Sequence, residues 1–99
     1  MSILMIDDLP KTKPFTADRY ALTYDEGIEA LKEGGWVTLL LDHDLGDMQR
    51  PERTGMDILN WLEQNPEFLP EQIIIISRSP RKLDMRKLVN KLYGRGFRL

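Results

Sequence analysis

The chain has 99 residues, of which 41% are hydrophobic and 30% are charged, and this length leaves room for one domain with one hydrophobic core. It contains no cysteine and a single histidine, His43, which excludes disulfide frameworks, thiolate metal sites and sites built on two imidazoles. The N-terminal residues lack the basic region of a signal peptide, and no apolar run approaches the roughly 20 residues that cross a membrane. We therefore expect one cytoplasmic domain over residues 1–99, in which any metal is held by oxygen.

The net charge of −2 conceals an uneven distribution of charge along the chain. Residues 78–98 carry eight basic side chains and one acidic side chain, whereas the rest of the chain carries six basic and fifteen acidic side chains. This asymmetry indicates either an acidic or phosphate-bearing partner for the C-terminal third, or a solvated basic helix face. The sequence leaves both interpretations open.

Strand-like and helix-like segments alternate along the chain, as in an α/β domain. The third and fourth apolar runs are nearly continuous, which is typical of parallel strands that are buried on both faces. In chain order we expect strands at residues 3–6 and 20–23, a helix at 25–33, a strand at 37–41, a helix at 55–64, a strand at 73–76, a helix at 81–93 and a short last strand at 96–99.

Local signals mark the ends of these elements. Thr23 and Glu26 have the spacing of a capping box, Gly34 with Gly35 supplies a left-handed stop, and Ser79 before Pro80 predicts another helix start. The segment between the first two strands has two prolines and no helical period, so we expect a loop where a doubly wound fold usually has a helix.

Acidic residues follow two of the predicted strands. Asp7 and Asp8 come directly after the first strand, and Asp42 and Asp44 follow the third. A strand order of 2-1-3-4 makes these turns neighbours at the carboxyl end of the sheet, where ligands bind in open parallel sheets. Crowded carboxylates that can be neutralised by a divalent cation predict a Mg²⁺ or Mn²⁺ site. The alternative is that these aspartates only end strands and cap turns.

A candidate phosphate site follows the fourth strand. The start of a helix offers free N–H groups, and nearby hydroxyl and guanidinium groups can hold phosphate oxygens. An ordinary helix cap with solvated arginines is the alternative. The candidate residues are Ser77, Arg78, Ser79 and Arg81.

His43 lies between two of the acidic residues. It is a candidate general acid or base, or a residue that fixes the turn by a hydrogen bond. Its side chain is expected to point away from those of Asp42 and Asp44 unless the turn rotates it. In the loop that follows, Arg50 and Arg53 could reach the crevice, although a solvated surface loop is the default interpretation.

These motifs resemble those of receiver domains, and more closely those of the cyclic-phosphate-processing receiver-like domains. The similarity spans nearly the whole chain. The matching features are Ile6-Asp7-Asp8 with Pro10, the helix entry at residues 23–31, the Leu-Asp-His-Asp-Leu-Gly run at 41–46, Thr54-Gly55-Met56-Asp57, Trp61-Leu62, and Ser77 before Pro80.

The resemblance implies a small flavodoxin-like fold with strand order 2-1-3-4, and optionally a fifth strand, that lacks the first crossover helix and the final helix. It also implies that Asp8 and Asp42 coordinate Mg²⁺ directly, that Asp7 acts through water, and that Asp44 supplies a carbonyl or carboxylate oxygen. Ser77 would bond the phosphoryl group, and Asp42 matches the phosphoacceptor of ordinary receivers. The group is associated with phages and prokaryotic conflict systems and is thought to process cyclic phosphates of nucleotides or RNA ends.

The sequence departs from this family pattern at three positions. Ile76 stands where the group usually has a second histidine, Ser79 replaces an asparagine, and only Arg98 lies near the position of the receiver lysine. A mechanism with two histidines is therefore excluded. Stable phosphorylation of Asp42 and switching through a last helix are not expected.

Three functions fit the sequence. The first is hydrolysis of a cyclic phosphate by a water that the metal activates, with His43 transferring a proton and Arg78 or Arg81 balancing charge. The second is a receiver-like module that binds or sequesters a nucleotide or phosphate signal without turnover. The third is a small phage-type protein inhibitor, in which Trp61, Tyr93, Phe97 and the basic helix make the contacts.

Overall fold

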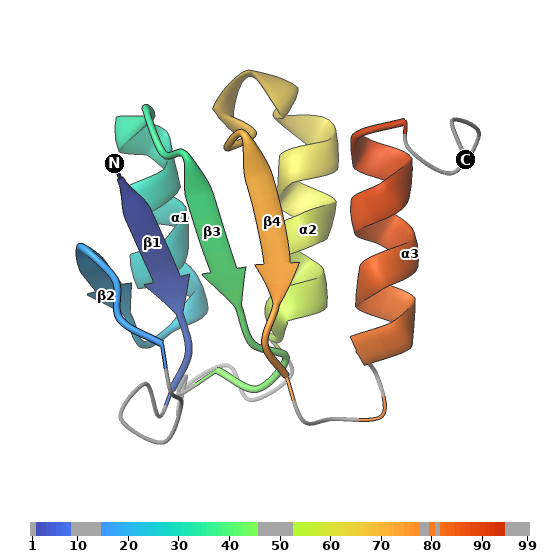
Figure 1. Cartoon of the computed structure of the whole chain (residues 1–99), viewed down its shortest axis with the longest axis horizontal. Coiled ribbons are helices and arrows are strands. Elements are labelled where there is room, and N and C mark those ends of the chain that lie inside the picture. The colour runs from blue at the N-terminus through green and yellow to red at the C-terminus, as the bar shows by residue number, and fades with distance from the viewer. Residues whose placement is uncertain (1, 9–14, 46–52, 78–79, 81, 95–99) are drawn as a thin grey trace.

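The computed structural model describes residues 2–8, 15–45, 53–77, 80 and 82–94. Strands and helices alternate through most of this chain (Figure 1). In order they are β1 (Ile3–Ile6), β2 (Arg19–Ala21), α1 (Tyr24–Glu33), β3 (Thr38–Leu41), α2 (Gly55–Gln64), the 3₁₀ helix η2 (Pro66–Phe68), β4 (Gln72–Ile75) and α3 (Lys82–Leu92). In the described part of the chain, no helix is both long and apolar enough to span a bilayer.

The four strands form one parallel sheet with the order β2-β1-β3-β4. The register places Met5 of β1 opposite Tyr20 and Leu40 on its two neighbours, and Leu40 in turn lies opposite Ile74. The strand order predicted from the sequence is therefore confirmed. From β1 the chain adds β2 on one side of the sheet, and then adds β3 and β4 on the other side. The switch point therefore lies between β1 and β3, and the ends of these two strands flank it.

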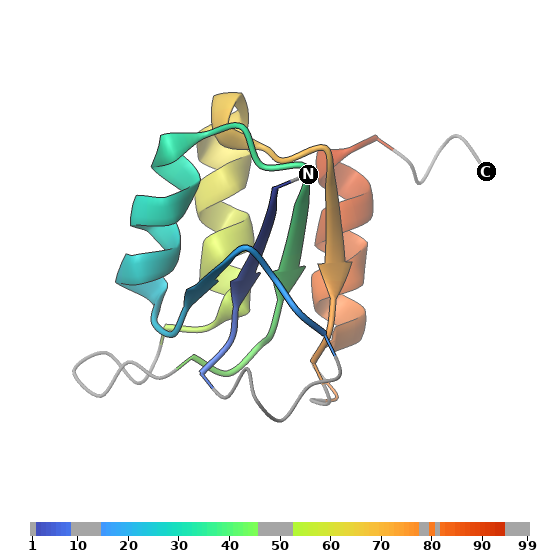
Figure 2. The same ribbon diagram turned by 60° about the vertical axis from the view of Figure 1, so that its left-hand side comes forward.

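All three α-helices cover the same face of the sheet, because they contribute to one hydrophobic cluster with it (Figures 1 and 2). Right-handed crossovers require this arrangement of α1 and α2: the connections β2-α1-β3 and β3-α2-β4 run in one direction across the sheet, and β1 to β2 runs in the other. The helix α3 follows the last described strand, and its packing in the same cluster places it on this face. The segment leading into β2 accordingly crosses the opposite face, where Ala17 packs against the cluster that contains Met5 and Leu40 (Figure 2). Residues 15–18 contain no helix, and residues 9–14 of the predicted loop lie outside the described residues.

The main core lies between the sheet and the helices. Its strand residues include Leu4, Ile6, Leu39 and Leu41, all fully buried. Burying a side chain of this size stabilises the fold by about 1.5–3 kcal/mol. The helices contribute Ile28, Ala30, Leu31, Ile58, Leu59, Leu62, Met85 and Val89.

The opposite face has a smaller hydrophobic cluster and is partly open. Met5, Leu40 and Ile76 are buried there, whereas Ile74 of β4 is 43% exposed. The expectation of burial on both faces is thus confirmed for β3, in which every residue is buried, and wrong for β4, in which burial alternates. The physical reason is that β4 is the last described strand of a face that no described helix covers, whereas Leu40 of the interior strand β3 packs there with Met5 and Ile76.

The predicted helix ends agree with the structure in most details. The Thr23 hydroxyl accepts a hydrogen bond from the Glu26 N–H at 3.1 Å, but the Glu26 carboxylate accepts from the Leu22 N–H rather than from Thr23. Because Thr23 serves as the N-cap of α1, β2 ends at Ala21 instead of residue 23. Gly34 and Gly35 have φ values of 73° and 77°, as expected of a left-handed stop. The predicted cap at Ser79 and the predicted strand at 96–99 lie outside the described residues.

Candidate metal and phosphoryl site

The backbone of the sheet places the acidic turns side by side. Hydrogen bonding continues one residue past the strands: the Asp7 N–H donates to the Ala21 carbonyl, and the Asp42 N–H donates to the Ile6 carbonyl, each at 3.0 Å. The backbone of Asp7 is therefore fixed beside β2, and the backbone of Asp42 is fixed beside β1. Neither position depends on a flexible loop.

Three carboxylates converge at this end of the sheet. One oxygen each from Asp7, Asp8 and Asp42 lie within 4.8 Å of one another. Asp7 is fully buried and Asp42 is 6% exposed, whereas Asp8 is only partly buried. Three oxygen ligands at this spacing, with one side open, are suited to a hard divalent cation that keeps part of its hydration shell.

The electrostatics of Asp8 show that negative charge is crowded here. Partial burial raises the pKa of Asp8 above its usual value of 3.8. The pKa is raised further by the charge of Asp7, by a hydrogen bond to Asp7 and by the charge of Asp44. A backbone hydrogen bond lowers it in part. A bound cation would remove this penalty, because it favours the ionised form of every carboxylate around it. The chemistry of the donor set therefore fits Mg²⁺ or Mn²⁺.

Asp44 lies outside the group of three converging oxygens and contacts His43 instead. The His43 Nδ1 lies 3.0 Å from an Asp44 carboxylate oxygen, and the side chains are 17% and 73% exposed respectively. The side chain of His43 thus faces Asp44, which is the case expected if the turn rotates it. In this turn the His43 carbonyl accepts a hydrogen bond of 2.7 Å from the Gly55 N–H, and Asp44 forms an antiparallel bridge with Thr54. A metal-binding role for Asp44 remains a prediction.

Ser77 is the one described member of the predicted phosphate site. It lies two residues after β4 and is 7% exposed, at the same end of the sheet as the carboxylates. The preceding residue extends the ladder, since the Ile76 N–H donates to the Leu41 carbonyl at 3.0 Å. Arg78, Ser79 and Arg81 lie outside the described residues, and so does Arg50.

Comparison with protein families identifies the family of the chain: the sequence model of the cyclic-phosphate processing receiver domain matches residues 2–92. The chain belongs to this family. Comparison with curated proteins and with solved structures gave no match. The domain is therefore a receiver-like domain of the family associated with cyclic-phosphate processing.

Ile76, where the family resemblance predicts a second histidine, is part of a hydrophobic cluster in this receiver-like domain. It is 8% exposed and packs with Met5 and Leu40 on the face without described helices. An apolar contact therefore occupies this position. His43 is the single histidine of the chain.

Sequence reasoning missed the support that α2 gives the site. A Cβ atom on Gly55 would lie 2.0 Å from the Asp42 carbonyl oxygen, so only glycine allows the helix to approach this closely. Thr54 caps the helix in a complete capping box: its hydroxyl accepts from Met56 N–H at 3.2 Å, and its own N–H donates to Asp57 at 2.7 Å. The Thr-x-x-Asp spacing was visible in the sequence, but the close approach of Gly55 was not.

Arg53 has a position that the sequence did not settle. Its guanidinium lies over the Tyr24 ring, 4.9 Å from the ring centroid, and its Nη1 is 3.8 Å from the Asp57 carboxylate. The arginine thus links the start of α1 to the start of α2. The described residues therefore support a structural role for Arg53.

Proposed function

We propose that the domain is a metal-dependent hydrolase that opens a cyclic phosphate of a nucleotide or an RNA end. The observation that carries this proposal is the convergence of Asp7, Asp8 and Asp42 within 4.8 Å, next in the chain to a histidine whose ring is held by a carboxylate. Membership of the cyclic-phosphate processing family supports the substrate class.

Asp7, Asp8 and Asp42 would hold the metal. When bound, a Mg²⁺ or Mn²⁺ ion supplies charge neutralisation at the phosphoryl oxygens and lowers the pKa of water. The buried carboxylates contribute rigidity, because their backbone is fixed by the sheet, and Asp8 contributes a partly exposed ligand that can face substrate. Their joint negative charge also keeps the substrate phosphate away unless a cation is present.

His43 is suited to move the proton. Its contact with Asp44 fixes Nδ1 as the protonated nitrogen, which leaves Nε2 as a base. Hydrolysis forms one P–O bond to the water oxygen and breaks one P–O bond of the ring. In our proposal, His43 takes the proton of the attacking water at Nε2 and returns it to the leaving oxygen, so that one imidazole serves both steps.

The phosphate itself would be held on the other side of the site. The buried Ser77 hydroxyl lies at the end of β4, and Arg78, Ser79 and Arg81 follow it in the sequence. Hydroxyl, backbone N–H and guanidinium donors together match the oxygens of a phosphodiester. The proposed partner is therefore a phosphate-bearing small molecule, nucleotide or RNA end.

A turnover assay tests this proposal. The protein is incubated with Mg²⁺ and a panel of 2′,3′- and 3′,5′-cyclic nucleotides and cyclic-phosphate RNA ends, and the products are analysed by mass spectrometry. We expect a linear monoester from the wild type and none from Asp42→Asn. Glu67→Gln removes the same charge from an exposed residue of η2 at the opposite end of the sheet and should leave the rate unchanged.

The burial of Ile76 favours a second candidate, a module that binds a cyclic phosphate without turnover. Such a module needs the carboxylate cluster and the phosphate donors but no second proton-transfer group. Equilibrium dialysis in Mg²⁺ separates the candidates, because a sequestering module returns the nucleotide unchanged while an enzyme returns the monoester.

The inhibitor hypothesis has less support from the described residues. Trp61 stacks on Phe68 with ring centroids 5.5 Å apart, and the Tyr93 hydroxyl donates to the Pro70 carbonyl at 2.6 Å. Both rings therefore make their main polar or stacking contacts within the domain. Phe97 lies outside the described residues.

A further inference from the structure

Gly55 has no side chain, and atoms from two other elements occupy the space that one would take. A Cβ atom on Gly55 would lie 2.0 Å from the Asp42 carbonyl oxygen and 2.6 Å from the Cε methyl of Met85. Both atoms therefore lie on the same side of Gly55. The carbonyl belongs to the residue that follows β3, and the methyl belongs to α3.

Met85 reaches this position from inside the protein. The residue is fully buried and belongs to the main core. Because a methionine side chain is unbranched and flexible, its terminal methyl can fill a narrow gap between backbone segments. Through Met85, α3 thus contacts the start of α2 at the place where α2 supports the acidic turn.

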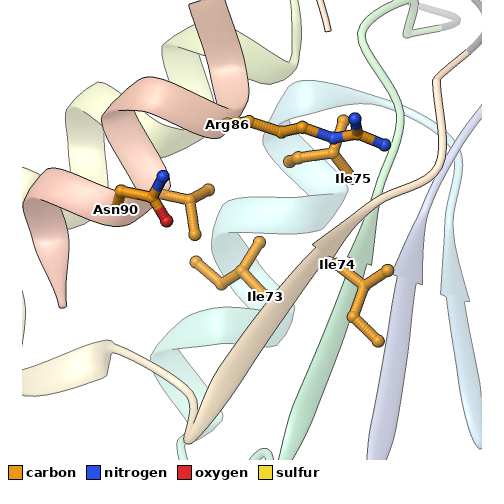
Figure 3. Close-up of a pocket in the computed structure, with 6 residues that line it drawn as sticks. Ile73, Ile74, Ile75, Arg86 and Asn90 are labelled. Carbon is orange, nitrogen blue, oxygen red and sulfur yellow. The ribbon is translucent and has the colours of Figure 1, made fainter. Parts of the chain in front are cut away.

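The next inward residue of α3 has different neighbours. Val89 lies one turn after Met85 and lines a groove against Ile73 and Ile75 of β4. Figure 3 shows Arg86 extending from the helix over Ile75 in this groove. Since α3 begins at the end of the sheet where the strands finish (Figure 1), Met85 is nearer than Val89 to the carboxylates.

The backbone of Gly55 contacts both site residues that follow β3. It lies against the Asp42 carbonyl, and its N–H donates to the His43 carbonyl at 2.7 Å. The Asp42 N–H is held separately, by the Ile6 carbonyl. The Asp42 side chain leaves the backbone between its own N–H and carbonyl groups, so its direction depends on how firmly both are held.

We propose that Met85 is a positioning residue for the metal site, a role that rests on the proposed function of Asp42 as a ligand. Its methyl group fills the space beside Gly55 and keeps this glycine against the Asp42 carbonyl. Where a void replaces an atom in a close-packed interior, the neighbouring groups lose their contacts outright. Without the methyl, Gly55 can move toward α3, and the Asp42 carboxylate loses its fixed direction relative to the other two carboxylates.

Hydrogen exchange of the Gly55 amide in metal-free protein tests the contact itself, because this amide donates to the His43 carbonyl. Met85→Leu keeps the core apolar and nearly conserves its volume, but the leucine methyls end one bond closer to the helix. We expect the Gly55 amide of this variant to exchange about tenfold faster than in the wild type, relative to the amides of β3, because the opening is local.

Isothermal titration calorimetry with Mg²⁺ tests the consequence for the site. Loss of a residue that supports metal ligands from behind raises the metal Kd by about 10–100-fold. Met85→Leu replaces one apolar contact by a shorter one, so we expect a rise of about tenfold, at the lower end of this range.

Two core variants serve as controls. Val89→Ala loosens α3 against β4, and Leu62→Ala removes a fully buried side chain near the other end of α2. Both should lower the melting temperature. Neither should change the Mg²⁺ Kd or the exchange of the Gly55 amide relative to the amides of β3.

Unchanged exchange of the Gly55 amide in Met85→Leu would overturn the proposal. Equal increases in the two control variants would overturn it as well, because any loss of core packing would then suffice. Faster exchange with an unchanged Mg²⁺ Kd would overturn the role toward the metal. A wild type that binds no Mg²⁺ would overturn the proposed function, and the exchange of the Gly55 amide would still decide whether Met85 holds the acidic turn.

Discussion

Among single residues, Asp8 gives the clearest pH dependence of stability, because its ionised form destabilises the folded state. Because its pKa in the folded protein lies above the usual value of 3.8, the folded state binds more protons than the unfolded state between these two pKa values. Without metal, the free energy of unfolding therefore falls as pH rises above 3.8 through the folded-state pKa. The penalty is absent below this window.

Asp8→Asn removes this penalty, so the variant should gain stability relative to the wild type as pH rises through the window in a chelating buffer. Chemical denaturation of both proteins at several pH values measures the difference. Saturating Mg²⁺ should reverse the order at neutral pH, because the wild type then uses Asp8 as a ligand. A difference in unfolding free energy that does not change with pH would show that Asp8 carries no such charge penalty.

The pair of His43 and Asp44 gives a prediction about rate rather than stability. If His43 carries the proton, His43→Ala should lower turnover by about 10²–10⁴-fold. Asp44→Asn should lower it by about 10–100-fold, since it weakens the group that orients the ring. Neither variant should abolish the rise in melting temperature that Mg²⁺ produces. Loss of that rise in Asp44→Asn would instead make Asp44 a metal ligand.

The positions of Asp7, Asp8 and Asp42 could be predicted from sequence because each directly follows a strand, and strand order fixes which strand ends meet. The orientation of His43 could not. Its ring contacts Asp44 within a turn that is held by a hydrogen bond from the Gly55 N–H to the His43 carbonyl, and nothing in the sequence around His43 specifies a contact with a residue so far along the chain.

At the scale of elements, the start of α2 is the support on which Asp42 depends. Gly55→Ala should destabilise the domain by about 3 kcal/mol, the upper part of the range for overpacking, because its Cβ would meet the Asp42 carbonyl at 2.0 Å. It should also weaken Mg²⁺ binding, since the carbonyl can give way only by moving Asp42. Thermal and chemical denaturation with and without Mg²⁺ measure both effects.

Gly27→Ala in α1 is a matched control. The nearest obstacle to its Cβ is the end of the Ile6 side chain at 2.8 Å, which can rotate away. Alanine also favours a helix over glycine by about 1 kcal/mol, so this variant should stay within about 1 kcal/mol of the wild type and bind metal normally. Equal losses of metal binding in the two variants would contradict the specific role of Gly55.

Element boundaries were predicted well where a local signal decides them. α2 begins and ends where its periodicity indicated, and the two glycines after α1 stop that helix. The errors have two causes: strand and helix-cap signals compete for the same residue, and burial depends on which face of the sheet a residue lies. Thr23 belongs to a β-rich run but is used as a helix cap, and Ile74 belongs to an apolar run but lies on the uncovered face.

At the scale of the whole molecule, one face of the sheet has no helical layer in the described chain. Of the connections between the described strands, right-handedness assigns only that from β1 to β2 to this face, and its described residues, 7–8 and 15–18, contain no helix. The proline-rich segment predicts a loop there, and its residues 9–14 lie outside the described residues. It does not predict that α1 and α2 share the other face, because that follows from strand order and handedness together; the place of α3 on the same face is seen from its packing in the main core.

The central claim, that Asp7, Asp8 and Asp42 form a metal site, is tested most directly by a thermal-shift titration with Mg²⁺ and Mn²⁺. A ligand that binds only the folded state raises its stability by about 2.7 kcal/mol at a hundredfold excess over the Kd. The wild type should show a saturable rise in melting temperature. Without metal, Asp42→Asn should be at least as stable as the wild type, because one repulsive charge is gone, and should show no rise. A wild type indifferent to millimolar metal, or an unchanged rise in Asp42→Asn, would contradict the claim.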